Sequence, residues 1–581
     1  MKITGGEAVV KSLVEHEVKM VYGLPGLHIL GIYDFLRDEK TIDHILVMHE
    51  VSAAVMADAQ GRLTGKPGVC IVTAGPGATN AVTGIAQAYA EASPVIQITG
   101  HSSTHEKMQP GHGVDDYEFL LKIYQPITKW STRIKKVEDI PKILDKAFTL
   151  ASSGRPGPVH IEIPYDILAS RGRVESSKPC SKNESRNALA CSDIAASAKS
   201  VAEILKSATY PMVALGRGVL REFCSDKVIE IAKKLGAPII TVPSATGAIP
   251  YECPLYLGYD LAADDTRWAM HPLINSFINK ADVILALGFD IGERLSYFRK
   301  KNNQSIYVHH ETQAPHSNGK PNASTRLPIN VETSIKHFLS ALEKQIKEKH
   351  VEAKNTLQNI SDTKKEIRDD IAKSIKWGSK PIHPGEIGAT LRRILDDDAI
   401  LTLDVGNSSE WMRICYRAKT PYTILMPGRY GSMGFSLPAA VAAKINYPKK
   451  QVAAIVGDGG FLMSYMDFPT LVKYKLGVIV IVENDQRYGM IWHMQRAKYM
   501  GRTFATEMPV LNFAQYARAF GATGIEVRDP CDLNEALEEA VNVRGPVLVD
   551  INTEYKFPVY LPTRLARSLR KIRDFGISSI H

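Results

Sequence analysis

Short apolar runs alternate with stretches of helical periodicity along almost the whole chain, and this alternation constrains the fold more than any other feature. An apolar run followed by a helical segment is typical of a β-α-β unit, in which neighbouring strands run parallel. We therefore predict an α/β protein built from doubly wound parallel sheets. Strands are expected near residues 20–23, 44–48, 68–73, 94–99, 159–163, 212–215, 239–242, 283–287, 306–309, 400–403, 452–456, 478–482 and 547–551.

The length of 581 residues requires several domains, because one hydrophobic core rarely serves more than about 250–300 residues. Two segments divide the apolar runs into three groups: a polar stretch at 171–192, which has linker composition, and a charged helical stretch at 344–378. We predict α/β domains at 1–170, 193–343 and 379–555. A basic tail follows at 556–581, and we expect it to fold over a ligand site.

The composition excludes several classes of protein. No apolar run reaches the roughly 18 residues of a membrane span, and the first residues lack a signal-peptide core, so we expect a cytoplasmic protein without a membrane partner. The seven cysteines are scattered and form no CxxC pair, which disfavours a disulfide framework or a zinc site. The net charge of +9 is modest, and no aromatic and basic platform accompanies the tail, so no nucleic-acid partner is expected.

Two of the predicted strands end in an acid. "VGDGG" at 456–460 places Asp458 after one strand, and "VENDQRYG" at 482–489 places Asp485 after the next. The carboxyl ends of parallel strands meet at one sheet edge, so these carboxylates should lie side by side. Mg²⁺ and a phosphate group would satisfy the carboxylates and the free backbone N–H groups of the glycines. "GDGG" alone is equally typical of a turn, so the pairing of the two motifs carries the prediction.

These paired motifs resemble the metal–diphosphate signature of thiamine-diphosphate enzymes, and the resemblance covers most of the chain. It implies that Mg²⁺ is bound by Asp458, Asp485 and the main-chain carbonyl of Arg487, although many relatives have Asn in place of Asp485. "GRYGSMGFSLPAA" (428–440) is similar to the segment that grips the aminopyrimidine ring, with Met433 wedged between the two cofactor rings. The other cofactor contacts that the resemblance implies are Pro25, Gly26, Gly75, Asn80, Gly406, Asn407, Ser408, Gly431, Gly459, Gly460, Tyr488, Gly489 and Met490.

The segment "MHEVSAAVMADAQGR" (48–62) resembles the part of the family that carries the catalytic glutamate, which assigns this role to Glu50. The resemblance implies a hydrogen bond from Glu50 to a pyrimidine nitrogen, which helps to form the ylide of the cofactor. Without the resemblance, Glu50 is simply an acid at a helix start. Glu50 and Asp458 fall in different domains, and the cofactor of relatives bridges two subunits. A homodimer or homotetramer is therefore implied.

The domain order looks most like the acetolactate synthase branch, which implies a carbon–carbon bond enzyme that decarboxylates, cleaves or ligates 2-oxo acids or acyloins. A 2-hydroxyacyl-CoA lyase or an oxalyl-CoA decarboxylase, acting on an acyl-CoA, remains the alternative. Tyr165 in "GPVHIEIPYDIL" replaces the expected lysine of acetolactate synthases. His28 lies where benzaldehyde lyase has a pocket histidine. Candidates for moving protons in the substrate pocket are His28, His101, Gln109 and His112.

Two further readings concern other classes of protein and the central domain. A non-catalytic thiamine-binding subunit is disfavoured because Glu50 and the metal motif are both intact, and a dehydrogenase would need a G-x-G-x-x-G after the first strand of a block. "LGRGVL" (215–220) and "LGFDIGERLS" (287–296) resemble flavin-binding segments, notably at Arg217 and Arg294. The resemblance allows FAD, ADP or no nucleotide in the central domain.

Overall fold

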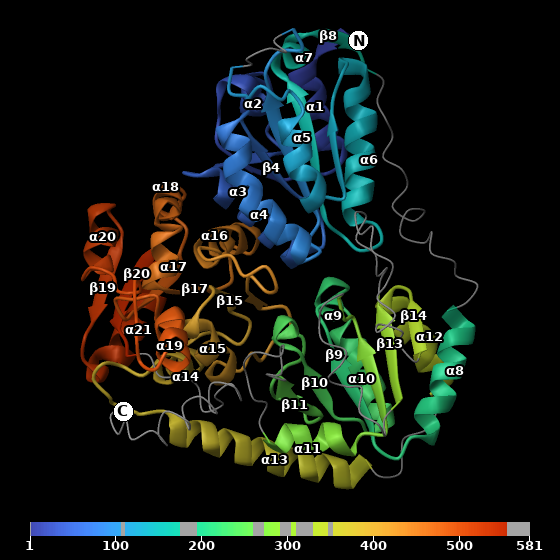
Figure 1. Cartoon of the computed structure of the whole chain (residues 1–581), viewed down its shortest axis with the longest axis vertical. Helices are drawn as coiled ribbons and strands as arrows, with labels where there is room; N and C mark the ends of the chain where they lie inside the picture. The colour runs from blue at the N-terminus through green and yellow to red at the C-terminus, as the bar shows by residue number, and fades with distance from the viewer. Residues whose placement is uncertain are drawn as a thin grey trace.

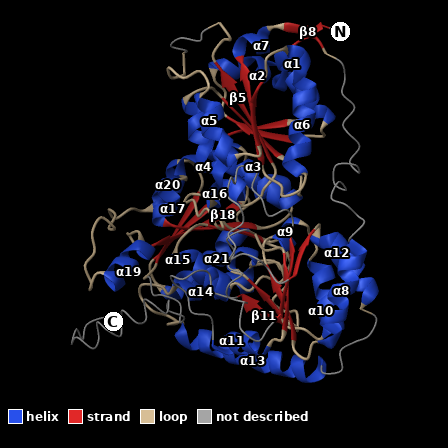
Figure 2. Cartoon of the chain, turned by 45° about the vertical axis from the view of Figure 1, so that its right-hand side comes forward, coloured by secondary structure: helices blue, strands red, loops and turns tan. Residues whose placement is uncertain are grey.

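Three six-stranded sheets, each with all strands parallel, form three domains in the computed structural model (Figure 1). The structure describes residues 2–105, 111–174, 194–259, 272–290, 304–309, 329–346 and 353–554. In Figure 1 the N-terminal domain (blue) lies above the C-terminal domain (orange to red) and the central domain (green). Figure 2 shows the strands of each domain covered by helices. The predicted fold class of three parallel-sheet α/β domains is therefore confirmed.

The N-terminal sheet has the order β3-β2-β4-β5-β7-β6, and its central strands are buried on both faces. A small antiparallel pair, β1 with β8, closes its far end. The strands are β1 (Lys2–Thr4), β2 (Met20–Gly23), β3 (Asp43–Leu46), β4 (Gly68–Val72), β5 (Val95–His101), β6 (Trp130–Arg133), β7 (Pro158–Pro164) and β8 (Arg171–Arg173). The helices are α1 (Gly5–Glu15), α2 (Leu30–Asp38), α3 (Glu50–Thr64), α4 (Pro76–Ala90), α5 (Phe119–Tyr124), α6 (Ile140–Ser152) and α7 (Tyr165–Ala169).

The central sheet has the order β11-β10-β9-β12-β13-β14. Its strands are β9 (Pro211–Leu215), β10 (Ile239–Thr241), β11 (Tyr256–Tyr259), β12 (Val283–Leu287), β13 (Gln304–His309) and β14 (Ile329–Glu332). Its helices are α8 (Ile194–Ser207), α9 (Gly218–Arg221), α10 (Ser225–Leu235), α11 (Pro272–Lys280) and α12 (Ile335–Gln345). The charged connector contains α13 (Ala353–Ser374), which runs along the lower edge of the molecule in Figure 1.

The C-terminal sheet has the order β16-β15-β17-β18-β20-β19. Its strands are β15 (Ile400–Leu403), β16 (Ile424–Leu425), β17 (Val452–Gly457), β18 (Val478–Asn484), β19 (Thr523–Val527) and β20 (Val547–Asn552). Its helices are α14 (Pro384–Ile394), α15 (Asn407–Cys415), α16 (Ser436–Asn446), α17 (Asp458–Leu462), α18 (Phe468–Lys473), α19 (Gly489–Lys498), α20 (Phe513–Ala519) and α21 (Leu533–Asn542).

Each strand that we predicted is present, with its ends shifted by a few residues at most, whereas seven short strands were not predicted. All seven lie at sheet edges or in the small antiparallel pair: β1, β6, β8, β11, β14, β19 and the two-residue β16. Edge strands such as β19 keep most of their side chains partly exposed, so their sequences lack the continuous apolar signal of buried strands. The tail at 556–581 and most of the linker lie outside the described residues.

The N-terminal and C-terminal domains share one hydrophobic core, because α3 packs against α16. Met56 and Ala59 of α3 are buried together with Leu437 and Ala440 of α16. Asp467 is fully buried in this interface, where it accepts hydrogen bonds from the Ser52 hydroxyl and from the Met48 amide at 3.3 Å. Burial raises the pKa of Asp467 to about 7.

Two predictions from composition concern membrane spans and cysteines. No helix in those parts of the chain is long and apolar enough to cross a bilayer. Five cysteines are present there as free thiols: Cys70, Cys224, Cys253, Cys415 and Cys531.

Candidate functional site

The two acids that follow the predicted strands lie together at the carboxyl edge of the C-terminal sheet. Strands β17 and β18 are adjacent and parallel, with Gly457 opposite Glu483. Asp458 begins α17, is buried, and accepts hydrogen bonds from the amides of Gly459 (2.6 Å) and Arg487 (3.3 Å). The strand order therefore brings the "VGDGG" and "VENDQRYG" motifs into contact.

A cavity of about 110 Å³ opens at this edge, and residues of the C-terminal domain line it. Among the predicted cofactor contacts, Gly431 does not line the cavity. The atom nearest to a Cβ placed on Gly431 belongs to Val405, which does line it. The other predicted contacts from this domain all line the cavity: Gly406, Asn407, Ser408, Met433, Asp458, Gly459, Gly460, Asp485, Arg487, Tyr488, Gly489 and Met490.

Several buried polar atoms in this cavity have no hydrogen-bond partner among the described residues. They include Oδ2 of Asp485, both side-chain polar atoms of Asn407 and both carboxylate oxygens of Glu483. Buried polar groups are normally satisfied, so such a cluster indicates that a ligand completes it. Glu483 was not predicted; it lies within β18, between five apolar residues and Asn484.

Burial controls the protonation of these acids. It raises the pKa of Asp458 to about 6 and, together with the nearby charge of Asp458, the pKa of Asp485 to about 7. Burial and then the charge of Asp485 raise the pKa of Glu483 to about 8. A divalent cation between Asp458 and Asp485 would reverse the first two shifts, because it favours the ionised carboxylates.

Two glycines allow the chain to pass close to these acids. A Cβ atom on Gly459 would lie 2.7 Å from the ring of Tyr488, and one on Gly489 would lie 2.6 Å from Oδ2 of Asp485. Neither position can carry a side chain without moving its neighbours. The backbone amides of both loops can therefore approach an anion closely, as phosphate binding requires.

Asp404 fixes the segment that bears Met433, and this role was not predicted. Its carboxylate is buried and accepts hydrogen bonds from the amides of Gly434 (3.0 Å) and Ser436 (2.9 Å). Met433 in turn lies beside the "GDGG" loop, with Cε 3.5 Å from a Cβ placed on Gly459. The signal that could have found Asp404 is the same as for Asp458, an acid directly after a buried strand.

The N-terminal domain holds the same segment from the other side, through Gln87 of α4 and Glu91 directly after this helix, neither of which was predicted. The side-chain amide of Gln87 donates to the carbonyl of Pro427 and accepts from the hydroxyl of Ser432 at 2.9 Å. Glu91 accepts from the amide of Arg429 at 3.0 Å. Both side chains are fully buried, so α4 of one domain positions the 427–432 loop of another.

Glu50 lies at the start of α3 but is not a solvated helix-start acid. It is only 7% exposed, and its Oε2 accepts a hydrogen bond of 2.9 Å from Asn80 of α4. Gly77, near Asn80 at the start of α4, approaches the other oxygen, Oε1. Gly75, also predicted, packs against the carbonyl of His112. Pro25 and Gly26 follow β2, and Gly26 lies against Thr73 of the same region.

The structure separates the predicted proton-transfer candidates into two groups. The buried ring of His28 lies 4.9 Å from the ring of His112 and 5.7 Å from that of Tyr165. His101 instead belongs to a cluster in which its Nε2 lies 3.4 Å from Glu162, and Glu162 pairs with Arg133 at 2.7 Å. Burial lowers the pKa of His101. Gln109 lies outside the described residues.

The flavin expectation can be tested on Arg217, since Arg294 lies outside the described residues. Arg217 is buried and pairs with Glu91 at 2.9 Å, and Asp290 lies 4.0 Å away. It also donates to the carbonyl of Ala90 at 3.2 Å. Its guanidinium thus joins the central domain to the C-terminal end of α4, and FAD in the central domain stays a prediction.

Three family models match the chain, each in the domain that the fold leads one to expect. The N-terminal TPP binding domain of thiamine pyrophosphate enzymes matches residues 3–118, the central domain matches 198–342, and the C-terminal TPP binding domain matches 404–551. Thiamine pyrophosphate is another name for thiamine diphosphate. The matches include the segments of Glu50, Asp458 and Asp485.

Full-length relatives show the same similarity. The acetolactate synthase isozyme 3 large subunit of Escherichia coli is 33% identical over 570 residues, which cover 96% of each chain. The acetolactate synthase of Bacillus subtilis is 31% identical, covering 96% of this chain and 94% of the relative. A probable acetolactate synthase large subunit of Methanocaldococcus jannaschii is 32% identical, covering 94% and 91%.

Proposed function

Because the chain belongs to the thiamine pyrophosphate enzyme family and is a thiamine-diphosphate-dependent enzyme of the acetolactate synthase kind, we propose that it catalyses the Mg²⁺-dependent decarboxylative ligation of 2-oxo acids. The observation that supports this most is the pair Asp458 and Asp485 at adjacent strand ends, beside Asn407 and Met433 in one cavity. The relatives described above match the whole domain order. The acyl-CoA lyase alternative has no comparable support and is not carried forward.

The proposed reaction joins two molecules of pyruvate into one acetolactate. The bond between the carboxylate and the carbonyl carbon of the donor breaks and releases CO₂, and a new bond forms between the donor and acceptor carbonyl carbons. One proton is taken up by the acceptor oxygen. When bound, thiamine diphosphate supplies the nucleophilic carbon and the electron sink for these steps. The protein holds the cofactor, positions both substrates and moves protons.

In this proposal, Asp458, Asp485 and the main-chain carbonyl of Arg487 hold Mg²⁺. Oxygen ligands of this kind suit Mg²⁺, which also retains phosphate oxygens and waters. No cluster of three or more His, Cys, Asp or Glu side chains suited to a metal occurs in the parts of the chain that the structure describes. Asp458 and Asp485 would supply the carboxylates that hold the cation beside the diphosphate. The unsatisfied polar atoms of Asn407 offer further contacts to that group.

In the same proposal, Glu50 holds a proton at the pyrimidine nitrogen. The hydrogen bond from Asn80 fixes Oε2, which leaves Oε1 for the cofactor. Burial of this carboxyl strengthens any hydrogen bond that it makes. His28, with His112 and Tyr165 beside it, is proposed to donate and accept the substrate proton.

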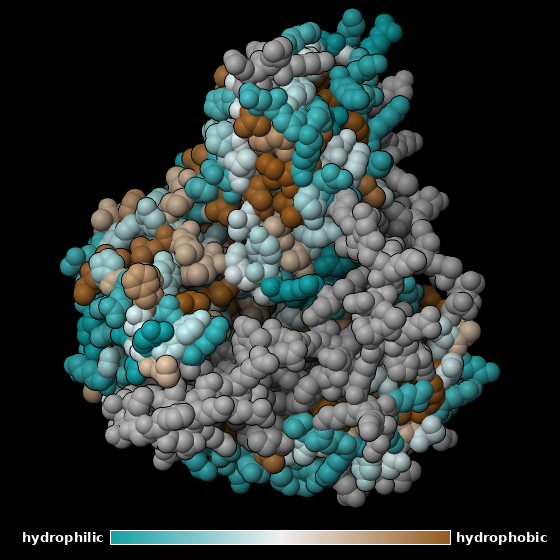
Figure 3. Space-filling view, viewed as in Figure 1, coloured by the Kyte–Doolittle hydropathy of each residue, from teal (hydrophilic) through white to brown (hydrophobic). Residues whose placement is uncertain are grey.

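We also propose that the active unit contains at least two chains. Glu50 belongs to the N-terminal domain, whereas the lining of the Asp458 cavity comes from the C-terminal domain of the same chain. In the proposed assembly, the N-terminal domain of one copy completes the site at the C-terminal domain of the other. Figure 3 shows apolar side chains exposed on the N-terminal domain. Leu27 and Leu30 of that domain and Phe504 and Val510 of the C-terminal domain are at least half exposed, which suits burial between copies.

Product analysis tests the proposed reaction. The purified chain, with thiamine diphosphate and Mg²⁺, is incubated separately with a panel of 2-oxo acids, acyloins and 2-hydroxyacyl-CoAs, and the products are identified by mass spectrometry. We expect acetolactate from pyruvate and no turnover of the acyl-CoAs. Cleavage of a 2-hydroxyacyl-CoA without any ligation of pyruvate would refute the proposal. Each incubation is run with and without added FAD.

A further inference from the structure

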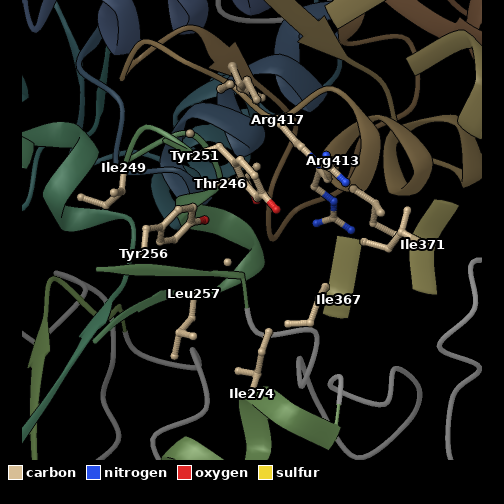
Figure 4. Close-up of a pocket in the computed structure, with 15 residues that line it drawn as sticks. Thr246, Ile249, Tyr251, Tyr256, Leu257, Ile274, Ile367, Ile371, Arg413 and Arg417 are labelled. Atoms are coloured by element: carbon tan, nitrogen blue, oxygen red, sulfur yellow. The ribbon is translucent and has the colours of Figure 1, made fainter. Parts of the chain in front are cut away.

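A second cavity lies in the seam between the central domain, the connector helix α13 and the C-terminal domain (Figure 4). It encloses about 80 Å³ and shares no lining residue with the cavity of Asp458. The seam is closed by two backbone hydrogen bonds between the domains, from Tyr251 to Ala418 (2.8 Å) and from Tyr422 to Gly247 (3.1 Å). Ligand sites are frequent at such domain junctions.

Two arginines of the C-terminal domain enter this cavity. In Figure 4, Arg413 of α15 and Arg417 just after it extend toward the space bounded by Tyr251, Ile367 and Ile371. Arg413 is paired with Glu410. The side chain of Arg417 instead lies over the ring of Tyr251, with Cζ 5.0 Å from the ring centroid, and its buried Nε has no hydrogen-bond partner among the described residues.

A third cation increases the positive charge of the seam. The ammonium group of Lys364 on α13 lies 4.6 Å from the centroid of the same Tyr251 ring and donates to the carbonyls of Tyr251 (2.6 Å) and Cys253 (3.2 Å). Burial lowers the pKa of Lys364, and the charges of Arg417 and Arg368 add to this effect. Arg413, Arg417 and Lys364 thus bring three cations to the seam, where Glu410 is paired with Arg413 and the charge of Glu252 acts on Lys364. The surplus of positive charge favours an anion in the cavity.

The rest of the lining is mostly apolar. Six isoleucines contribute to it, namely Ile249, Ile274, Ile367, Ile371, Ile414 and Ile424. A single water needs on the order of 10–15 Å³ of such space, so the cavity has room for a molecule of about five to seven heavy atoms. A fully inorganic anion would leave the isoleucines against polar oxygen, and a hydrocarbon would leave Arg417 unsatisfied.

We propose that this cavity binds a small aliphatic monocarboxylate, with its carboxylate held by Arg417 and Arg413 and its carbon chain against the isoleucines. A planar guanidinium is suited to a carboxylate, because its N–H groups match the two oxygens. The site goes beyond the proposed function, since the ligand needs no 2-oxo group. Helix α15 also carries Asn407 and Ser408 at its other end, so the site lies one helix away from the cofactor cavity.

Isothermal titration calorimetry on the full chain, saturated with thiamine diphosphate and Mg²⁺, tests the proposal. The probes are the sodium salts of propionate, butyrate and pentanoate, with butyramide and butanol as uncharged controls. We expect one saturable site for at least one acid. Affinity for that acid should fall by at least about tenfold in Arg417→Met, the loss expected for one charge-assisted hydrogen bond. The wild type should bind butyramide no more tightly than Arg417→Met binds the acids.

Three further variants keep the outcome clear. Arg544→Met, at an exposed arginine of the same domain, should bind like the wild type. Arg417→Lys retains the charge and should lose less than Arg417→Met. Ile371→Phe fills the apolar part of the cavity and should weaken binding even if Arg417→Met fails to fold. The proposal would be overturned if no acid showed saturable binding, if Arg417→Met bound the acid with wild-type affinity, or if the wild type bound butyramide as tightly as butyrate. Thiamine diphosphate binding by each variant is a separate readout, so this result does not bear on the proposed reaction.

Discussion

Replacement of Gln87 by Ala tests whether α4 of the N-terminal domain holds the cofactor loop of the C-terminal domain. Gln87 is fully buried and contacts the loop through the carbonyl of Pro427 and the hydroxyl of Ser432. The loop leads directly to Gly431 and Met433, which are predicted cofactor contacts. The variant should therefore change cofactor binding as well as stability.

The structure sets the expected magnitude. Two strong side-chain hydrogen bonds and a longer one of 3.4 Å from the Ser432 amide are lost, each of the strong ones with a net value of about 0.5–1.5 kcal/mol, and the carbonyl of Pro427 is left buried without this donor. We expect a destabilisation of about 2–3 kcal/mol. If half of this free energy is lost from the loop conformation that binds the cofactor, the affinity for thiamine diphosphate falls about tenfold.

Two assays separate these effects. Thermal unfolding reports the loss of stability, and calorimetric titration with thiamine diphosphate at saturating Mg²⁺ reports cofactor affinity. The matched control is Gln358→Ala on α13, where an exposed glutamine makes one hydrogen bond, to Asp362. The control should leave both quantities nearly unchanged. A Gln87→Ala protein that is destabilised but binds the cofactor with wild-type affinity would refute the positioning role.

Other predictions concern the metal, the catalytic acid and the domain interface. Asp458→Asn should abolish the Mg²⁺ dependence of thiamine diphosphate binding, and EDTA-insensitive binding equal to that of the wild type would disprove the metal assignment. Glu50→Gln should lower kcat by on the order of 10²–10⁴ with little change in cofactor affinity, and wild-type turnover would make Glu50 a structural acid. The raised pKa of Asp467, about 7, means that the folded chain retains a proton that the unfolded chain releases above its ordinary value of 3.8. Its contribution to stability is thus largest at low pH and is lost as pH rises from about 4 to about 7, by up to about 1.4 kcal/mol per pH unit. Asp467→Asn should remove this slope from chemical unfolding measured across that range, and an unchanged slope would contradict the assignment.

Burial on both faces decided which strands could be predicted. Strand β4 is buried at every position and reads as a continuous apolar run, whereas β16 has two residues and β19 is mostly half-exposed. The predicted strands therefore come from the middle of each sheet, with the exception of the edge strand β3. The edge strands depend on contacts with residues far away in the chain, which the local sequence does not reveal.

The site residues divide in a similar way. Asp458 and Asp485 could be predicted, because each acid directly follows an apolar run whose neighbour in the sheet follows from the β-α-β pattern. Gln87 could not, since its partner Pro427 lies 340 residues away in another domain. The fold likewise places the buried carboxylate of Glu91 beside Arg217, a pairing that the motif of Arg217 did not indicate. Long-range pairing of this kind has no local signal.

The proposed reaction requires that Glu50 of one chain and Asp458 of another form one site at which pyruvate is converted to acetolactate. Mixed oligomers of Glu50→Gln and Asp458→Asn chains test this directly. In a mixed dimer one site would carry both substitutions and the other would carry neither. Acetolactate formation should therefore recover to about a quarter of the wild-type rate after random mixing, because half of the dimers are mixed and each has one intact site. Failure of the mixture to exceed the activity of either variant alone, with mixed dimers shown to be present, would contradict the account.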